Sequence, residues 1–130
     1  MSPTLELMPQ TFAIFQLGPT ESVPEWVQGE FVSVTRTTDE LSIVCEQPES
    51  NKVQDISSLI KTDADWRCFR VKGQLDFSLV GIIAEITETL AAANVPVFVI
   101  STFNTDFVLV KAETLDMTIK SLRSAGMFDG

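Results

Sequence analysis

WRCFRVKGQLDFS at residues 66–78, VPVFVIST at 95–102 and FNTDFVLVK at 103–111 are the segments that decide the fold. The first begins as an apolar strand and enters a polar loop at Gly73. An apolar-periodic run that reaches residue 93 separates it from the second segment. We interpret the order as strand, polar loop, helix, strand, turn and strand. The two loops of this unit hold the chemically suggestive residues.

A helix is predicted between the two loops. Its apolar residues recur with helical spacing at positions 79, 82, 83, 86, 90 and 93. Ser78 has the side chain of an N-cap, so we expect the helix to begin there. Asn94 suits the left-handed position that ends a helix, and Pro96 prevents continuation.

The rest of the chain is predicted to hold further strands and one more helix. Thr114 is expected to cap the last helix, and Gly126 is expected to end it. The first half has only weak helical signals, a single turn at 24–28 and a loose pattern at 53–60. Residues 1–9 read as a loose lead-in. Strands are expected at 11–17, 31–36, 41–46, 97–102 and 106–111.

The order of these elements repeats along the chain. Strand, helix and hairpin recur at a separation of roughly 60 residues, although residue identity barely repeats. This order predicts an α/β (α+β) protein with the ferredoxin-like βαββαβ plan and antiparallel sheets. We expect a degenerate repeat at 1–62 and a clearer one at 63–130. The strand after the first helix is expected beside the first strand, and strand 11–17 at the open edge of the second repeat.

Composition and charge exclude several classes of protein. The 130 residues fit one domain or two very small ones. The formal charge of −9 disfavours nucleic-acid binding. The longest apolar run, residues 95–100, is too short to span a membrane. The N-terminus lacks the features of a signal peptide, so we expect a cytoplasmic location.

The cysteines and the absence of histidine limit catalysis. Cys45 and Cys68 lie in apolar runs and are expected to be free and buried. Without histidine, the chain has no zinc-site spacing and no Ser-His or Cys-His pair. We therefore predict no catalytic residues, no metal and no cofactor. An enzyme would depend on the two thiols or on carboxylates and is the least favoured reading.

The two loops form the candidate site. Helix amides near residues 79–81 lack internal partners and could receive a carboxylate, and Gly81 would permit close approach. Taken alone, this signal is weak. Asp76 and Asp106 could meet an ammonium group, although each could instead be a turn residue that caps backbone amides. Phe103, with its counterpart at position 77, could line a pocket or belong to the core.

Residues 75–84 and 100–110 together resemble the ACT domain. They are most similar to the tandem ACT-like proteins that include the cytosolic arginine sensor of animals. The resemblance covers residues 66–126 well and residues 11–60 only by element order. It implies tandem βαββαβ repeats, amino-acid binding at repeat or subunit interfaces, homo-oligomers and regulation rather than catalysis. Arginine sensors carry four such repeats, whereas this chain has room for two.

The resemblance also assigns the residues of the candidate site. Residues 73–81 match the ACT loop and helix start, and the segment from Thr102 to Asp106 matches the one that carries a ligand-contacting aspartate in the sensor. The expected ligand-binding residues are Gly73, Asp76, Phe77, Ser78, Leu79, Val80, Gly81, Thr102, Phe103, Asn104 and Asp106. The leading hypothesis is an amino-acid-binding regulatory module. The alternative is an interaction protein whose repeats dimerise without a metabolite.

Overall fold

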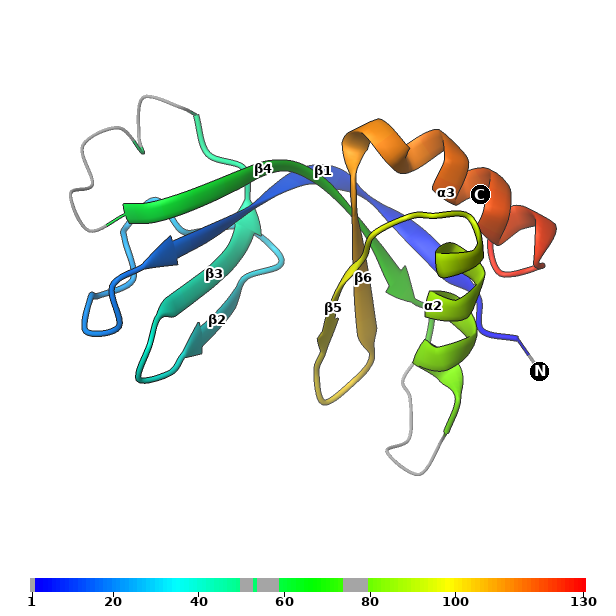
Figure 1. Ribbon diagram of the computed structural model, residues 1–130, viewed down its shortest axis with the longest axis horizontal. Helices are drawn as coiled ribbons and strands as arrows, with labels where there is room; N and C mark the ends of the chain where they lie inside the picture. The colour runs from blue at the N-terminus through cyan, green and yellow to red at the C-terminus, as the bar shows by residue number, and fades with distance from the viewer. Residues whose placement is uncertain (1, 50–52, 54–58, 74–79) are drawn as a thin grey trace. The chain divides into compact units, whose positions relative to one another are not determined.

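The computed structural model describes residues 2–49, 53, 59–73 and 80–130, and Figure 1 draws them in colour. None of the described helices is long and apolar enough to cross a membrane. The elements are β1 (Leu5–Leu17), β2 (Ser33–Arg36), β3 (Leu41–Glu46), β4 (Leu59–Val71), α2 (Ile82–Ala92), β5 (Phe98–Ser101), β6 (Asp106–Lys111), a 3₁₀ turn at Ala112–Thr114, and α3 (Leu115–Ser124).

The chain divides into two compact units. Unit 1 comprises residues 1–9 and 66–130, and unit 2 comprises residues 10–65. The strands hydrogen-bond in the order β2-β3-β1-β4-β6-β5. Strands β1 and β4 each contribute residues to both units. The division into repeats at 1–62 and 63–130 stays a prediction. The compact units have different bounds from these repeats, because residues 1–9 pack with residues 66–130.

Unit 1 has the strand order β1-β4-β6-β5, with β4 first in the βαββαβ sequence. The expected ferredoxin-like plan is therefore confirmed. Strand β6 pairs antiparallel with both β4 and β5, with Trp66 opposite Lys111 and Ser101 opposite Asp106. Strand β5 thus lies at the edge. The expectation that the strand after the helix lies beside the first strand was wrong, because β6 takes that place.

The first part of β1, residues 5–9, supplies the fourth strand of unit 1. The amide of Lys72 donates to the carbonyl of Thr4, and the amide of Leu5 donates to the carbonyl of Met127, each at 2.8 Å. The guanidinium of Arg70 lies 2.6 Å from the carboxylate of Glu6. The loose lead-in expected at residues 1–9 is therefore wrong, since β1 begins at Leu5. Its first residues, rather than 11–17, fill this edge.

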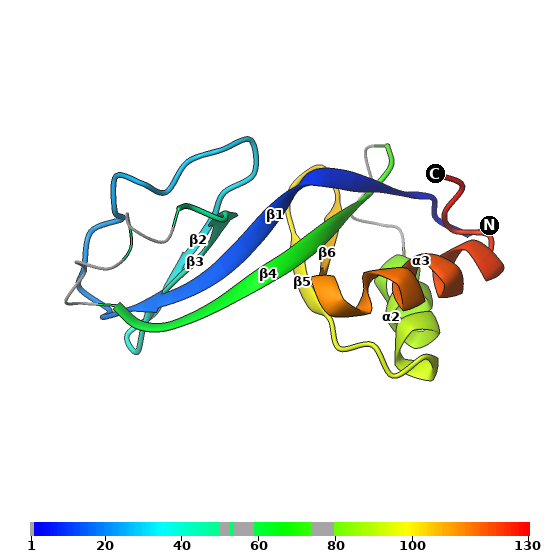
Figure 2. The same ribbon diagram turned by 90° about the horizontal axis from the view of Figure 1, so that it is seen from above.

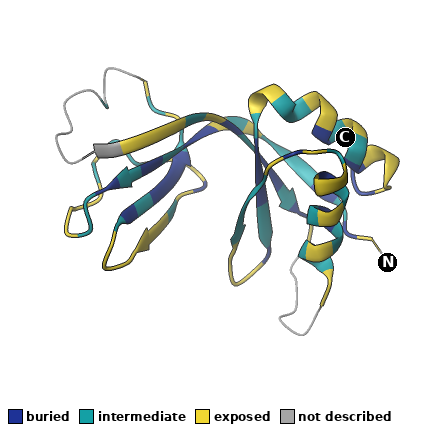
Figure 3. Cartoon of the chain, in the orientation of Figure 1, coloured by how far each residue is buried: buried dark blue, intermediate teal, exposed yellow. Residues whose placement is uncertain are grey.

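Both helices of unit 1 cover one face of its sheet (Figures 1 and 2). Phe69 and Val71 of β4, and Val108 and Val110 of β6, point to this face because strand side chains alternate. Helix α2 meets them with buried side chains one turn apart, Ile86 and Leu90, and α3 with Leu122. Along both helices, exposed residues alternate with less exposed ones (Figure 3). This alternation and helical spacing explain why one apolar core forms here.

Unit 2 has the strand order β2-β3-β1-β4. The bounds of β3, 41–46, are those expected, and its register places Phe15 of β1 opposite Ile43. Residues 24–27 form a turn, closed by the amide of Val27 on the carbonyl of Pro24, and not a helical turn. One buried apolar cluster of unit 2 contains Ala13, Phe15, Leu17, Leu41, Ile43 and Cys45.

Two helix predictions need correction. Helix α2 begins at Ile82, and Gly81 occupies its N-cap position with φ +83°, so Ser78 is not the cap. In the pattern at 53–60, Leu59 and residue 60 belong to strand β4, and residues 54–58 lie outside the described residues. The left-handed Asn94 (φ +60°) and the end of α3 before Gly126 (φ +76°) are confirmed.

We expect that Leu5→Ala will lower the free energy of unfolding by about 2–5 kcal/mol. Leu5 is buried in the core of unit 1, so truncation leaves a cavity. Met117→Ala, on the exposed side of α3, is the control and should change stability much less. Urea denaturation of both variants measures the difference. Equal losses would show that residues 4–6 do not complete the core.

Candidate functional site

The two predicted loops are brought together by one buried hydrogen bond. The hydroxyl of Thr105, between β5 and β6, donates to the carbonyl of Val71 at the end of β4, at 2.8 Å. Only 3% of Thr105 is exposed. Because Val71 immediately precedes the loop that leads to α2, this bond places the β5–β6 turn beside the start of that loop. Sequence analysis did not select Thr105; its only signal was a polar residue between a turn and an apolar strand.

Thr102 closes the β5–β6 turn. Its amide and its hydroxyl both donate to the carbonyl of Thr105, at 2.9 and 3.0 Å, and its hydroxyl oxygen faces the amide of Thr105 at 3.4 Å. A threonine hydroxyl that bonds to nearby backbone stabilises the turn, which is a common role of threonine in turns. Thr102 therefore shapes the turn that presents residues 103–106.

The other predicted residues of this turn are accessible to different degrees. Phe103 is 74% exposed, and Asn104 is exposed beside it. Asp106 is half-buried as the first residue of β6, opposite Ser101. The turn therefore presents an aromatic ring, an amide and a carboxylate from three positions of one short segment.

The loop before α2 is described only at its ends. Gly73 and Gly81 are both left-handed, with φ +84° and +83°, and a Cβ atom at either would meet no atom within 4 Å. Both glycines are therefore required by backbone conformation rather than by crowding. Val80 is 89% exposed. Four predicted residues, Asp76, Phe77, Ser78 and Leu79, lie outside the described residues.

The first turn of α2 contains the amides of residues 82–84, because the helix begins at Ile82 and the amide of Glu85 donates to the carbonyl of Gly81. Amides in the first turn of a helix generally lack acceptors within the helix. These are the groups that could receive a carboxylate, three residues later than expected. Glu85 lies in the same turn and accepts a hydrogen bond from Ser2 at 2.8 Å.

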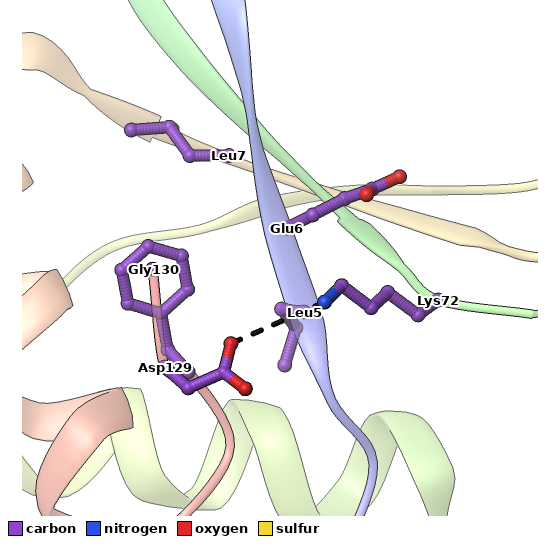
Figure 4. Close-up of a pocket in the computed structure, with 7 residues that line it drawn as sticks. Leu5, Glu6, Leu7, Lys72, Asp129 and Gly130 are labelled. Carbon is purple, nitrogen blue, oxygen red and sulfur yellow. Dashed lines mark ion pairs between the residues drawn. The ribbon is translucent and has the colours of Figure 1, made fainter.

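A separate open pocket of about 340 Å³ lies at the edge of β1 in unit 1 (Figure 4). Leu5, Leu7 and Phe128 give it apolar walls, and Lys72 and Asp129 face each other across it with a nitrogen–oxygen distance of 4.0 Å. The side chains of this pair are 46% and 82% exposed, so water screens both charges. This pocket was not predicted from the sequence, because its walls come from segments far apart along the chain.

The cysteines are poor nucleophiles in this fold. Both thiols are free and buried, as expected. Burial, with a smaller contribution from the charge of Glu46, raises the pKa of Cys45 to about 11. Burial raises the pKa of Cys68 to about 12. Because the thiolate is the reactive form, neither group is activated near neutral pH. Among the described residues, no cluster of three potential metal ligands occurs.

Two family models match the chain. The ACT domain model matches residues 61–124. A second model, described as an N-terminal domain, matches residues 10–51. These spans correspond to most of the continuous part of unit 1 and to most of unit 2.

Relatives and solved structures agree with the first of these matches. The human cytosolic arginine sensor for mTORC1 subunit 1 is 33% identical over 104 residues, which cover 78% of this chain and 32% of the sensor. The chain thus spans about a third of the length of that relative. A crystal structure of a protein from Agrobacterium tumefaciens is 31% identical, with a TM-score of 0.83, and the match covers 100% of this chain and 96% of that one.

More distant structures share the fold. The regulatory subunit of aspartate kinase from Thermus thermophilus matches with a TM-score of 0.64 at 10% identity, covering 96% of this chain and 99% of that chain. Residues 61–124 belong to the ACT-domain family, and the chain shares its fold with these solved structures.

We expect Thr105→Val to lower the free energy of unfolding by about 1–3 kcal/mol, because the carbonyl of Val71 would remain buried without its donor. Thr89→Val is the matched control, since the Thr89 hydroxyl donates only to a helical carbonyl one turn back. Chemical denaturation measures both. Equal effects of the two substitutions would mean that the Thr105 bond contributes little to stability.

The thiols give a prediction about pH. In the folded protein at pH 8, both should react slowly with a maleimide, and both should react rapidly in denaturant. The pKa values of Cys45 and Cys68 rise on folding from 9.0 to about 11 and about 12. The contribution of the protonated thiols to stability is therefore fully present below pH 9 and is lost as the pH rises toward 12. A Cys45→Ala, Cys68→Ala double variant should lose this part of the pH dependence. Rapid labelling of the folded protein at pH 8 would contradict the argument.

Proposed function

We propose that this chain is an amino-acid-binding regulatory module whose ligand lies between the loop at residues 73–81 and the turn at residues 102–106. The observation that carries the proposal is the Thr105–Val71 hydrogen bond, since it places the turn beside the start of the loop. The printed name of the human relative describes a sensor of arginine. Because that relative extends well beyond the matched segment, amino-acid binding by this chain is a proposal of its own.

The geometry supports complementary roles for the two segments. Free amides at the start of α2 would receive the α-carboxylate of an amino acid. Asp106 would accept the ammonium group, because a charge-assisted hydrogen bond is the strongest that a side chain can offer it. The exposed ring of Phe103 would contact the side chain of the ligand. Asp76 remains the second candidate for the ammonium group.

The alternative is an interaction protein that forms oligomers without a metabolite. Strand β5 supports a homo-oligomer, because it ends the strand order and its residues 98–100 are only half-buried. An open strand edge can pair with a second copy of the same edge. We propose a homodimer in either case, together with a cytoplasmic location and no catalytic activity.

A thermal-shift screen of the twenty amino acids separates the two readings. A ligand that binds only the folded state raises the melting temperature, and the shift grows with the logarithm of one plus the ratio of free ligand concentration to Kd. Light scattering with and without the best amino acid then measures the oligomeric state. No shift with any amino acid, together with a stable dimer, would favour the interaction protein and would end the sensor proposal.

We expect Asp106→Asn to weaken binding of the best amino acid roughly thirtyfold to several-thousandfold while the fold survives. Loss of one partner from a desolvated, hydrogen-bonded charge pair costs about 2–5 kcal/mol, and each 1.4 kcal/mol is about a tenfold change in affinity. Glu88→Gln, which removes an exposed carboxylate from α2 in the same unit, is the matched control and should leave affinity unchanged.

Calorimetry on the wild type and the two variants measures the affinities, and circular dichroism checks that each variant is folded. If folded Asp106→Asn binds the amino acid as well as the wild type does, Asp106 is only a residue of the turn.

A further inference from the structure

Unit 2 contains a pocket that the proposed amino-acid site does not use. It has a volume of about 280 Å³, comparable with the smaller ligand sites of proteins. Residues of the segment before β2 form one wall, and the end of β3 with the residues after it forms the other. The lining residues are Trp26, Gln28, Gly29, Glu46, Gln47 and Pro48.

Glu46 is the charged group among the described lining residues, and the backbone at residues 29 and 30 contacts its carboxylate. One carboxylate oxygen, Oε2, accepts a hydrogen bond from the amide of Glu30 at 2.8 Å. A Cβ atom at Gly29 would lie 2.2 Å from that same oxygen, and the φ of Gly29 is +128°. A side chain at position 29 would therefore collide with the carboxylate. The glycine is required for Glu46 to reach the position that it occupies.

The neighbouring walls are also fixed. The side chain of Gln47 accepts a hydrogen bond from the amide of Asp65 at 2.7 Å and donates to the Asp65 carboxylate at 3.1 Å. The indole of Trp26 packs edge-on against Phe15 with ring centroids 4.8 Å apart. Rigid lining of this kind reduces the entropy lost when a ligand binds.

The Nε1–H of Trp26 is buried and has no hydrogen-bond acceptor among the described residues. The atom also gives a direct spectroscopic reporter within the wall of the pocket.

The charge of the pocket defines the class of ligand. Among the described residues, its lining contains one carboxylate and no basic side chain. Residues 10–65 contain ten acidic and three basic side chains, a formal charge of −7. A cation is attracted by this field, and Glu46 and Trp26 both line the pocket. A free carboxylate on the ligand would find no countercharge among the described lining residues.

We infer that this pocket binds a small organic cation, an ammonium or guanidinium compound without a carboxylate, with its charge against Glu46. The inference differs from the proposed amino-acid site in unit, in lining and in ligand charge. It does not depend on that proposal.

Three probes define the specificity: putrescine, which offers ammonium groups, agmatine, which adds a guanidinium, and arginine, the carboxylated counterpart of agmatine. The chain has two tryptophans, so its NMR spectrum has two indole N–H signals, which a Trp66→Phe variant assigns. We expect putrescine or agmatine to shift the Trp26 signal in a saturable manner. The same signal should require at least tenfold more arginine.

Glu46→Gln tests the charge with little change of shape, because an amide oxygen can still accept from the amide of Glu30. We expect it to weaken binding of the amine about tenfold to a hundredfold, as loss of a charge-assisted hydrogen bond does. Asp39→Asn is the matched control. It removes one carboxylate from the same unit, in the turn before β3 and thus at the opposite end of that strand from Glu46.

A Gly29→Ala variant should also lose binding, because it displaces the Glu46 carboxylate. Asp106→Asn should leave the Trp26 titration unchanged, which keeps this result separate from the amino-acid site. The inference is overturned if neither amine shifts the Trp26 signal at millimolar concentration. It is equally overturned if arginine binds as tightly as agmatine, or if folded Glu46→Gln binds as the wild type does.

Discussion

The backbone hydrogen bonds of residues 4 and 5 are the constraint on which unit 1 depends. Residues 66–130 alone supply three strands and two helices, one strand short of the ferredoxin-like plan. The carbonyl of Thr4 accepts from Lys72, just after β4, and the amide of Leu5 donates to Met127, just after α3. These two bonds attach the start of β1 to the rest of unit 1. Leu5 then adds its side chain to the shared apolar core. The candidate site at the C-terminal end of β4 lies beside this pairing, because Thr105 bonds to Val71 and Thr4 bonds to Lys72.

Much of the fold could be predicted from sequence where local pattern and burial agree. Strands β3 and β6 have the predicted bounds, because uninterrupted β-branched and apolar residues lie between clear turns. The strand at residues 5–9 was missed because a short alternating run that ends in proline has no local signal of its partner. Helix α2 begins later than predicted, since the propensity of Ser78 for an N-cap was outweighed by the left-handed Gly81.

The candidate sites were predictable to different extents. The turn at residues 102–106 stands out by residue type, but its link to β4 depends on Thr105, whose burial follows from tertiary packing. The pocket in unit 2 was not predicted at all. Glu46 ends an ordinary strand and Gly29 lies in an ordinary loop, and only the close approach of the two gives either a special role. Sequence pattern reports periodicity well and reports contacts between distant loops poorly.

The division of β1 between the units has a consequence for synthesis of the chain. Unit 2 is continuous, so its strands are all available once residue 65 has left the ribosome. Unit 1 is discontinuous, and residues 4–6 must wait for partners that are made more than sixty residues later. Long-range pairing of this kind slows folding, because the entropy of closing the loop is lost before the stabilising contacts form. During that interval the segment with the apolar Leu5 and Leu7 lacks its partners in unit 1 and is open to chaperones or to a second chain.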